Sequence, residues 1–441
     1  MSNVNVGLML GERTARGVAV SQLVPESSLQ PYFDITSYGA LDSPSDIGPA
    51  VQRAANACIA YGGGVVFIPP RVDARQWGWT TAVLVDCTQD RSISFQGVPG
   101  QTAISLQVGQ TTPLTFPNSN GICQVDGLIF TGQGVLGDTN CACVIDFQQS
   151  RVGIVSRCQF FGCQCDGTGQ GVIRLVADTT VVRDCLFAGC CYAGTAFQGG
   201  VLSVTGNRDA SIVENVRFSN GIGSDGNFDG VNYRKTDFAL NWAWLWYGAQ
   251  GVDGAVTAYG EVQTKRCYFE SEARAGIDCS PEAGFISDHH RIEGCTFNFG
   301  AGGGARPGIK FSTVNGSTRT KRVEVVGCMF GNAASGNACI DAECGALILD
   351  ACRNLNVPGH TYKVTLLGAT DYVLFNESDG FVLDTTTATP AFFSAVLNGA
   401  MLPTTAPAAP PAQGYYVYVD AADNTLKAKA STGTVTPIAL P

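Results

Sequence analysis

Apolar and polar residues alternate with a period of two over short stretches of this chain, and one such stretch returns at regular intervals. It is clearest at 155–163, where Cys158 and Phe160 are two residues apart and therefore lie on the same face of a strand. A close copy follows at 182–190, and three later copies keep the Cys-x-Phe centre. With two looser copies, the repeated phenylalanines are Phe130, Phe160, Phe187, Phe218, Phe269, Phe297 and Phe330.

The spacing of these phenylalanines predicts a solenoid. Successive members are 30, 27, 31, 51, 28 and 33 residues apart, and the interval of 51 is interpreted as two coils, one of them unmarked. Repeats of this size pack mainly on their neighbours. Because each repeat consists of short strands separated by Gly, Asn and Asp, we expect an all-β solenoid in which like residues stack from coil to coil.

A helix is predicted ahead of the repeats. Val51, Ala54, Ala55, Cys58 and Ile59 fall on one helical face, Ser45 and Asp46 can cap the helix start, Pro49 fits its first turn, and Gly62–Gly64 ends it. We expect this helix to cover the apolar end of the first coil.

The expected organisation has six parts, which we define by composition and by the loss of the repeat near Cys352. They are an N-terminal attachment segment (1–31), the capping helix and first coil (32–81), the β-helix body (82–360), terminal strands (361–402), a Pro/Ala linker (403–413) and a C-terminal β module (414–441).

Segments near both ends of the chain resemble known families. The segments 33–40, 46–52 and 62–70 (FDITSYGA, DIGPAVQ and GGGVVFIPP) resemble the opening of pectin-lyase-like right-handed parallel β-helix proteins, which phage tailspikes commonly carry. The segment 415–438 resembles the short C-terminal modules of phage tail fibres and spikes. The resemblance implies a right-handed parallel β-helix, but the fold hosts lyases, hydrolases and inert fibres alike.

Composition narrows the range of partners. The formal net charge is −10 and no basic cluster occurs, which argues against a nucleic-acid groove. The N-terminus shows neither a signal peptide nor a membrane span. We therefore expect synthesis in a host cytoplasm.

The 18 cysteines sit at repeat-phased apolar positions, where a thiol packs as a small hydrophobe. Reduced thiols in a stacked core are the favoured interpretation, with occasional disulfides second and a metal third. The group Cys158, Cys163 and Cys165 could suggest zinc, but Cys185 and Cys190 share its repeat phase, which favours packing. No metal and no cofactor are expected.

Candidate chemistry gathers between Phe218 and Phe297, where carboxylates are frequent and the repeat is least regular. Glycoside hydrolysis requires one carboxylic acid and a second carboxylate. A lyase would instead need a base and cations such as Lys265, Arg266 or Arg274, and the sequence does not separate the two. For any single acid, a solvated coil edge is the commoner explanation. The candidate catalytic residues are Asp237, Glu270, Glu272 and Asp278.

Aromatic residues concentrate in the same region. Trp242, Trp244 and Trp246 alternate, and Tyr247 follows them. They are candidate substrate-binding residues, because sugar rings stack on such surfaces. A bulky interior coil or a face covered by a neighbouring subunit is the more common use of alternating aromatics.

Together these features favour a phage tailspike or fibre that binds a bacterial surface polysaccharide, with cleavage of that polymer left open. We expect a homotrimer in the virion tail, attached to other tail or baseplate proteins through residues 1–31. The first alternative is a non-catalytic structural or receptor-binding virion protein. The second is a free pectinase-like enzyme, a glycoside hydrolase or polysaccharide lyase.

Overall fold

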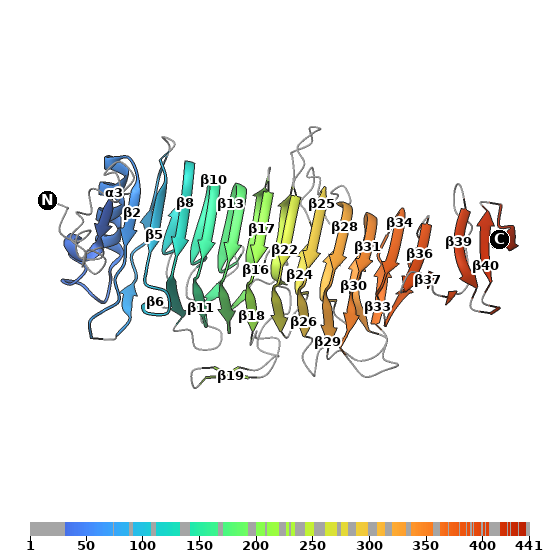
Figure 1. The fold of residues 1–441 in the computed structure, drawn as a ribbon. Coiled ribbons are helices and arrows are strands. Elements are labelled where there is room, and N and C mark those ends of the chain that lie inside the picture. Colours follow the sequence, from blue (N-terminus) through green and yellow to red (C-terminus); the bar gives the residue numbers. More distant parts are fainter. Residues whose placement is uncertain are drawn as a thin grey trace, which may run out of the picture.

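The computed structural model shows a parallel β-helix that runs along one axis, with a helix at one end and a small β-sheet at the other (Figure 1). The fold and its two terminal elements confirm the sequence prediction. The structure describes residues 31–437 except 74, 88–90, 107–111, 133–141, 166–170, 193–199, 208–209, 220–225, 229–230, 234–242, 251–260, 271–274, 281–287, 299–306, 314–319, 332–336, 356–361, 369, 379, 385, 389, 391, 398–399, 402, 405–414, 421, 424 and 431. The attachment segment and most of the linker thus lie outside the described residues.

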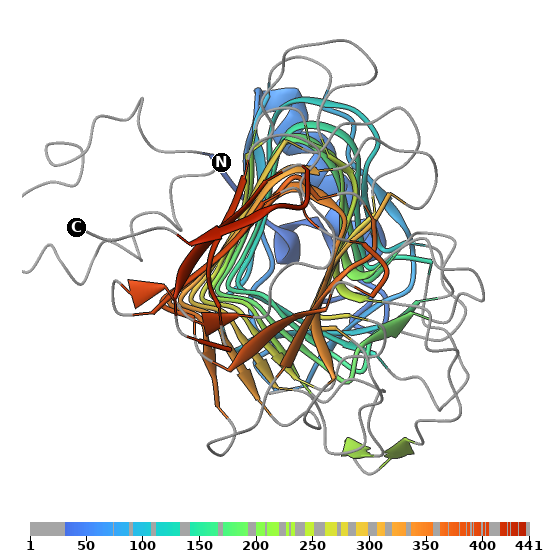
Figure 2. The same ribbon diagram turned by 90° about the vertical axis from the view of Figure 1, so that its right-hand side faces the viewer.

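Each coil contributes three strands, which stack on the matching strands of its neighbours to give three faces. One coil runs from β24 (Ile277–Cys279) on the first face to β25 (His289–Glu293) on the second and β26 (Thr296–Asn298) on the third. β24 pairs in parallel with β21 and β27, β25 with β22 and β28, and β26 with β23 and β29. The end view shows the strands arranged around a common interior (Figure 2).

The strands are grouped by face as follows. The first face contains β4 (Val83–Leu84), β7 (Leu114–Phe116), β16 (Gly200–Asn207), β21 (Ala243–Gln250), β24, β27 (Ile309–Phe311), β30 (Ala338–Ala342), β33 (Tyr362–Leu366) and β35 (Phe381–Asp384). The second contains β1 (Tyr32–Asp34), β2 (Gly64–Phe67), β5 (Ile93–Gln96), β8 (Ser119–Asp126), β17 (Ala210–Glu214), β22 (Glu261–Lys265), β25, β28 (Thr320–Val326), β31 (Cys344–Asp350), β34 (Tyr372–Asn376) and β36 (Phe392–Leu397), which pairs with β37 (Ala400–Met401). The third contains β3 (Trp77–Trp79), β6 (Thr102–Leu106), β9 (Leu128–Gly132), β11 (Gln159–Phe161), β14 (Leu186–Ala188), β18 (Arg217–Ser219), β23 (Tyr268–Glu270), β26, β29 (Met329–Gly331) and β32 (Arg353–Asn354).

Two long strands, β10 (Ile145–Ser156) and β13 (Ile173–Arg183), pass from the first face to the second. Two short pairs are separate from the three faces: β12 (Gln164–Cys165) with β15 (Cys191–Tyr192), and the antiparallel β19 (Gly226–Phe228) with β20 (Val231–Tyr233). The C-terminal sheet contains β38 (Pro403–Thr404), β39 (Tyr415–Asp420), β40 (Leu426–Ala430) and β41 (Val435–Pro437).

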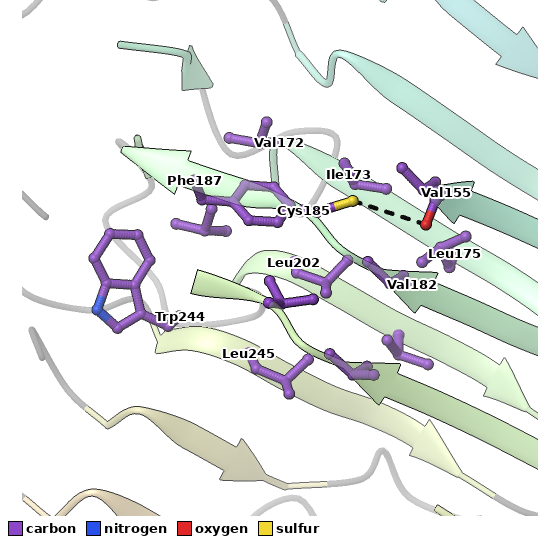
Figure 3. Close-up of a cluster of buried hydrophobic side chains, with 14 of the residues drawn as sticks. Val155, Val172, Ile173, Leu175, Val182, Cys185, Phe187, Leu202, Trp244 and Leu245 are labelled. Carbon is purple, nitrogen blue, oxygen red and sulfur yellow. Dashed lines mark hydrogen bonds between the residues drawn. The ribbon is translucent and has the colours of Figure 1, made fainter. Parts of the chain in front are cut away.

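The interior is built from columns of identical residues. The seven repeated phenylalanines are fully buried and stack with ring centroids 4.8–5.3 Å apart, close to the spacing of neighbouring strands. Cysteines form a second column at the corner between the second and third faces. The Cys185 thiol donates to the carbonyl of Val155 in the preceding coil, 3.8 Å away, with Phe187 beside it (Figure 3). The sixteen cysteines whose side chains the structure describes are all buried reduced thiols, as predicted.

The 51-residue interval between Phe218 and Phe269 is a single enlarged coil, and its interpretation as two coils was wrong. β18 pairs directly with β23, and the two phenylalanine rings stack at 5.0 Å. The additional residues include the β19–β20 pair, which lies between β18 and β21 in the chain. An insertion and an extra coil give the same spacing in a sequence, and only strand pairing distinguishes them.

The N-terminal helix α3 (Gly48–Tyr61) buries the predicted face, including Val51, Ala54 and Cys58, and ends at Gly62, whose φ is 118°. Asp46 lies just outside the helix, where it accepts a hydrogen bond from the Gly48 amide at 3.1 Å. The short 3-10 helix η2 (Ile35–Tyr38) precedes α3. Among the described residues, no helix is long and apolar enough to cross a membrane.

Candidate functional site

The structure describes five of the eight residues predicted to act in catalysis or substrate binding. Asp237, Glu272 and Trp242 lie outside the described residues. Glu270 and Asp278 are described, and so are Trp244, Trp246 and Tyr247. They divide between two faces of the β-helix.

Trp244 and Tyr247 belong to the core. Trp244 is fully buried, its ring centroid lies 5.5 Å from that of Phe218, and its indole N–H donates to the Glu270 carbonyl at 3.0 Å (Figure 3). Tyr247 is also fully buried and shares a 2.8 Å hydrogen bond with Thr264. Neither ring offers an exposed face to a sugar, so their positions favour the interior-coil alternative over a sugar platform.

Trp246 belongs to a row of outward side chains on the first face. Its neighbours Leu245 and Tyr247 join the core cluster, whereas Trp246 alternates to the opposite side of β21. Trp246 is nevertheless only 2% exposed, and its indole N–H donates to Ser280 Oγ at 3.1 Å. By register the row, which we call the first-face row, comprises Leu84, Thr115, Asp146, Arg174, Ser203, Trp246, Asp278, Lys310, Asp341, Thr365 and Asp384.

The first-face row alternates charges. Arg174 binds both carboxylate oxygens of Asp146, at 2.7 and 2.8 Å, which forms a bidentate ion pair. Further along, Lys310 occupies the rung between Asp278 and Asp341. Each of these side chains comes from a three-residue pattern in which apolar neighbours point inward and hold the charged residue outward.

Asp278 and Asp341 are the two carboxylates of this row whose spacing best suits a pair of catalytic acids in glycoside hydrolysis. They stand two rungs apart, which places their backbones about 10 Å from one another at the usual strand spacing. Asp278 is fully buried. Asp341 is partly buried, and burial raises its pKa. Lys310 and a hydrogen bond with Thr365 lower the pKa of Asp341 by smaller amounts. A carboxyl group with a raised pKa is suited to donating a proton.

Glu270 lies elsewhere, beside a groove on the third face. The groove has a volume of about 380 Å³ and is lined by Asn215, Val216, Arg217, Arg266 and Tyr268; we call it the corner groove. The Arg217 guanidinium lies 5.1 Å from the centroid of the Tyr268 ring. Glu270 follows Tyr268 by two positions on β23 and therefore points to the same side.

Sequence analysis did not identify Lys310, Asp341 or Arg217 as site residues. The available signal was a charged residue between two apolar residues in a short strand, as in Ile309–Phe311 and Ile340–Ala342. This pattern marks outward positions, but only strand register shows which of them share a row.

Within the described residues, no group of three or more His, Cys, Asp or Glu side chains is arranged to hold a metal ion. The adjacent histidines point to opposite sides of β25, as the alternation of a strand requires: His290 is buried and His289 is partly exposed.

No family model and no curated protein matches the chain. Among solved structures it is similar to the surface adhesin PfbA of Streptococcus pneumoniae, with 11% identity, 93% of this chain and 98% of that chain covered, and a TM-score of 0.45. It is similar to the A-module of the mannuronan C-5 epimerase AlgE6 of Azotobacter vinelandii, with 12% identity, 85% and 100% covered, and a TM-score of 0.36. It is also similar to the tailspike of Acinetobacter phage vB_ApiP_P1, with 14% identity, 85% and 60% covered, and a TM-score of 0.32.

The tailspike resemblance expected from the sequence is thus confirmed as a structural similarity. Similarity at this level, with all three TM-scores below 0.5, does not identify a function, which has to be argued from the residues of this chain.

Proposed function

We propose that this chain is a phage tailspike or tail fibre protein that binds a bacterial surface polysaccharide along its first face and hydrolyses it there. One observation carries the proposal: Trp246, Asp278, Lys310 and Asp341 occupy four consecutive rungs of one outward row. The two carboxylates supply the groups that break a glycosidic bond. Trp246 packs beside them, but at 2% exposure it offers no face for a sugar ring to stack on.

In this proposal Asp341 is the acid, because its pKa is raised by burial. It would donate its proton to the glycosidic oxygen as the bond to the leaving sugar breaks. Asp278 would accept a proton from the water whose oxygen attacks the anomeric carbon. The two backbones stand about 10 Å apart by strand spacing, near the 6.5–9.5 Å separation of carboxyl groups in inverting glycosidases.

The remaining features of the proposal concern assembly. We infer that residues 1–31 attach the chain to other tail or baseplate proteins, and that three chains assemble side by side in a virion tail after synthesis in the host cytoplasm. Asp237, Glu270 and Glu272 stay candidates for catalysis, and Trp242 stays a candidate for substrate binding.

A non-catalytic receptor-binding protein is the second candidate, and the complete burial of Asp278 favours it. A base must contact the water that it activates. If the row is a structural ladder of alternating charges, the protein would bind its polymer without cleaving it.

The deciding experiment is incubation of the purified protein with the surface polysaccharide of its host, followed by sizing of the products. Hydrolysis produces shorter chains with new reducing ends, whereas a lyase also produces unsaturated uronates that absorb ultraviolet light. We expect Asp341→Asn to lower the cleavage rate at least a hundredfold. Asp350→Asn is the matched control, because Asp350 is a half-buried carboxylate on the second face, where it accepts a hydrogen bond from the Asn376 side-chain amide at 2.7 Å.

Binding without any change in polymer size would replace hydrolysis by the receptor-binding alternative. Equal loss in Asp341→Asn and Asp350→Asn would show that the effect is structural.

A further inference from the structure

The corner groove lies on a different face from the first-face row, and no step of the proposed hydrolysis uses it. Its floor is the buried Val216, and its walls come from two neighbouring coils. Asn215 and Arg217 belong to one coil, and Arg266 and Tyr268 occupy the equivalent positions in the next. Its volume of about 380 Å³ falls within the usual range of ligand pockets.

We propose that the corner groove is a second glycan-binding site, which recognises a sugar residue that carries a carboxylate. The proposal rests on the proposed function only in taking the ligand to be a glycan. The new proposal goes beyond the proposed function because it assigns a separate site and an acidic sugar.

Stacking fixes the orientation of the Arg217 guanidinium. The group lies 5.1 Å from the Tyr268 ring centroid, and the ring itself is held by a hydrogen bond from Asn298 Nδ2 to Tyr268 Oη at 2.9 Å. A guanidinium that rests on an aromatic ring loses little further freedom when it binds, and its N–H groups match the geometry of a carboxylate. The corner groove is therefore preorganised for an anion.

The charge of Arg217 is also available. Arg217 is exposed and forms no ion pair with any other described residue, whereas the neighbouring Arg266 pairs with Glu214. Two carboxylates flank the groove, Glu270 on the same side of β23 and Asp184 at the Asn215 amide, so the Arg217 guanidinium is the group that a bound carboxylate would contact.

Asn215 adds a polar group to the corner groove. Its backbone is left-handed, with φ of 52°, and its side-chain amide donates to Asp184 at 2.6 Å. The amide oxygen can still accept a hydrogen bond from a sugar hydroxyl. Aromatic, guanidinium and amide groups thus converge on one groove.

The test is calorimetric titration of the full chain with short oligosaccharides of polygalacturonate, alginate, hyaluronan and polysialic acid, each in native and carboxyl-reduced form, with dextran as a neutral probe. We expect at least one native acidic probe to bind and its carboxyl-reduced form to bind at least tenfold more weakly. Arg217→Gln should weaken the native probe by at least tenfold. Arg353→Gln is the matched control, because Arg353 is an exposed arginine on the third face at the start of β32.

Three results would overturn the proposal. Equal binding of native and carboxyl-reduced probes would remove the carboxylate preference while leaving glycan binding intact. Equal losses in Arg217→Gln and Arg353→Gln would place binding elsewhere. Failure of every acidic probe to bind would contradict the acidic-sugar site. If the host polysaccharide also failed to bind, the proposed function would be contradicted as well.

Discussion

The corner cysteines show why a thiol suits this position. In each of six coils the single S–H of the cysteine after the corner has two carbonyl acceptors within reach, one two residues earlier and one in the preceding coil. For Cys295 these are the carbonyls of Glu293 and Thr264, at 3.6 and 3.5 Å. In the last coil Ser378 occupies the position of the cysteine, and its hydroxyl donates to the Asn376 carbonyl at 3.0 Å. The position therefore requires a small donor that tolerates burial, and disulfide or metal chemistry is not needed to explain it.

We predict that the native protein is unreactive toward a thiol reagent such as Ellman's reagent. Burial raises the pKa of Cys158 to about 12, and the thiolate is the reactive form. Unfolding in guanidinium without reductant should expose at least the sixteen described thiols. A much lower count would reveal disulfides, and rapid reaction of the folded protein would contradict the burial.

His290 makes stability depend on pH. It is buried between Tyr247 and Phe311, and desolvation lowers its pKa from 6.5 to about 3. Between these values the unfolded chain binds a proton that the folded chain does not, so stability falls as pH falls from about 6.5 toward 3. The full loss is about 4 to 5 kcal/mol.

We expect His290→Leu to flatten the dependence of the melting temperature on pH between 6.5 and 4, compared with the native chain. His289→Gln is the control, because His289 is on the outward side of the same strand. Carboxylates titrate in both proteins, so the difference between the two curves is the measurement. Parallel curves would contradict the assignment.

At the scale of elements, the turn between the second and third faces repeats one backbone conformation. Nine coils place a left-handed residue there, with φ between 46° and 69°: Gly127, Arg157, Asp184, Asn215, Arg266, Gly294, Gly327, Ala351 and Glu377. Only three of the nine are glycine, although a side chain in this conformation costs about 1 kcal/mol or more. Stacking of successive coils therefore fixes the turn more strongly than local preference does.

This turn yields a matched pair of substitutions. A Cβ added at Gly327 would meet no atom within 4 Å, so Gly327→Ala should cost only the backbone strain, about 1 kcal/mol. Ala351→Gly relieves the same strain one coil later, where φ is 51°, and should raise stability slightly. Thermal melts of both variants measure the effect, and a stabilising Gly327→Ala would show that the turn conformation is not enforced.

The sequence predicts the elements better than it predicts the site. Cys-x-Phe spacing and the helical face of 51–59 are local patterns, and both are confirmed by the buried columns and by α3. The first-face row is different, because Asp278 and Asp341 are more than sixty residues apart in the chain and meet only through two strand pairings. Alternation indicates that each points outward, but register depends on loop lengths, as the enlarged coil between Phe218 and Phe269 shows.

At the scale of the whole molecule, the β-helix has to protect the edge of its first coil. α3 covers that edge with apolar residues, and one of its side chains forms the hydrogen bonds that a neighbouring strand would otherwise form. The Gln52 amide donates to the Leu84 carbonyl at 2.9 Å and accepts from the Leu84 amide at 2.8 Å, so it satisfies both backbone groups of the edge strand β4. An unprotected strand edge is a template for pairing with another chain.

We therefore predict that Gln52→Ala lowers the melting temperature and increases self-association. Val51→Asp places a carboxylate in the buried contact of α3 with the first coil, so we expect it to disrupt the N-terminal coils more severely. Ala60→Gln is the control, because Ala60 lies on the exposed side of α3. Light scattering during heating reports association, and binding of an apolar dye reports exposed core. Since each coil packs mainly on its neighbours, damage at this end should spread inward from the first coil. Hydrogen exchange that rises evenly along the chain, rather than first near residues 31–106, would contradict a role of α3 as the cap.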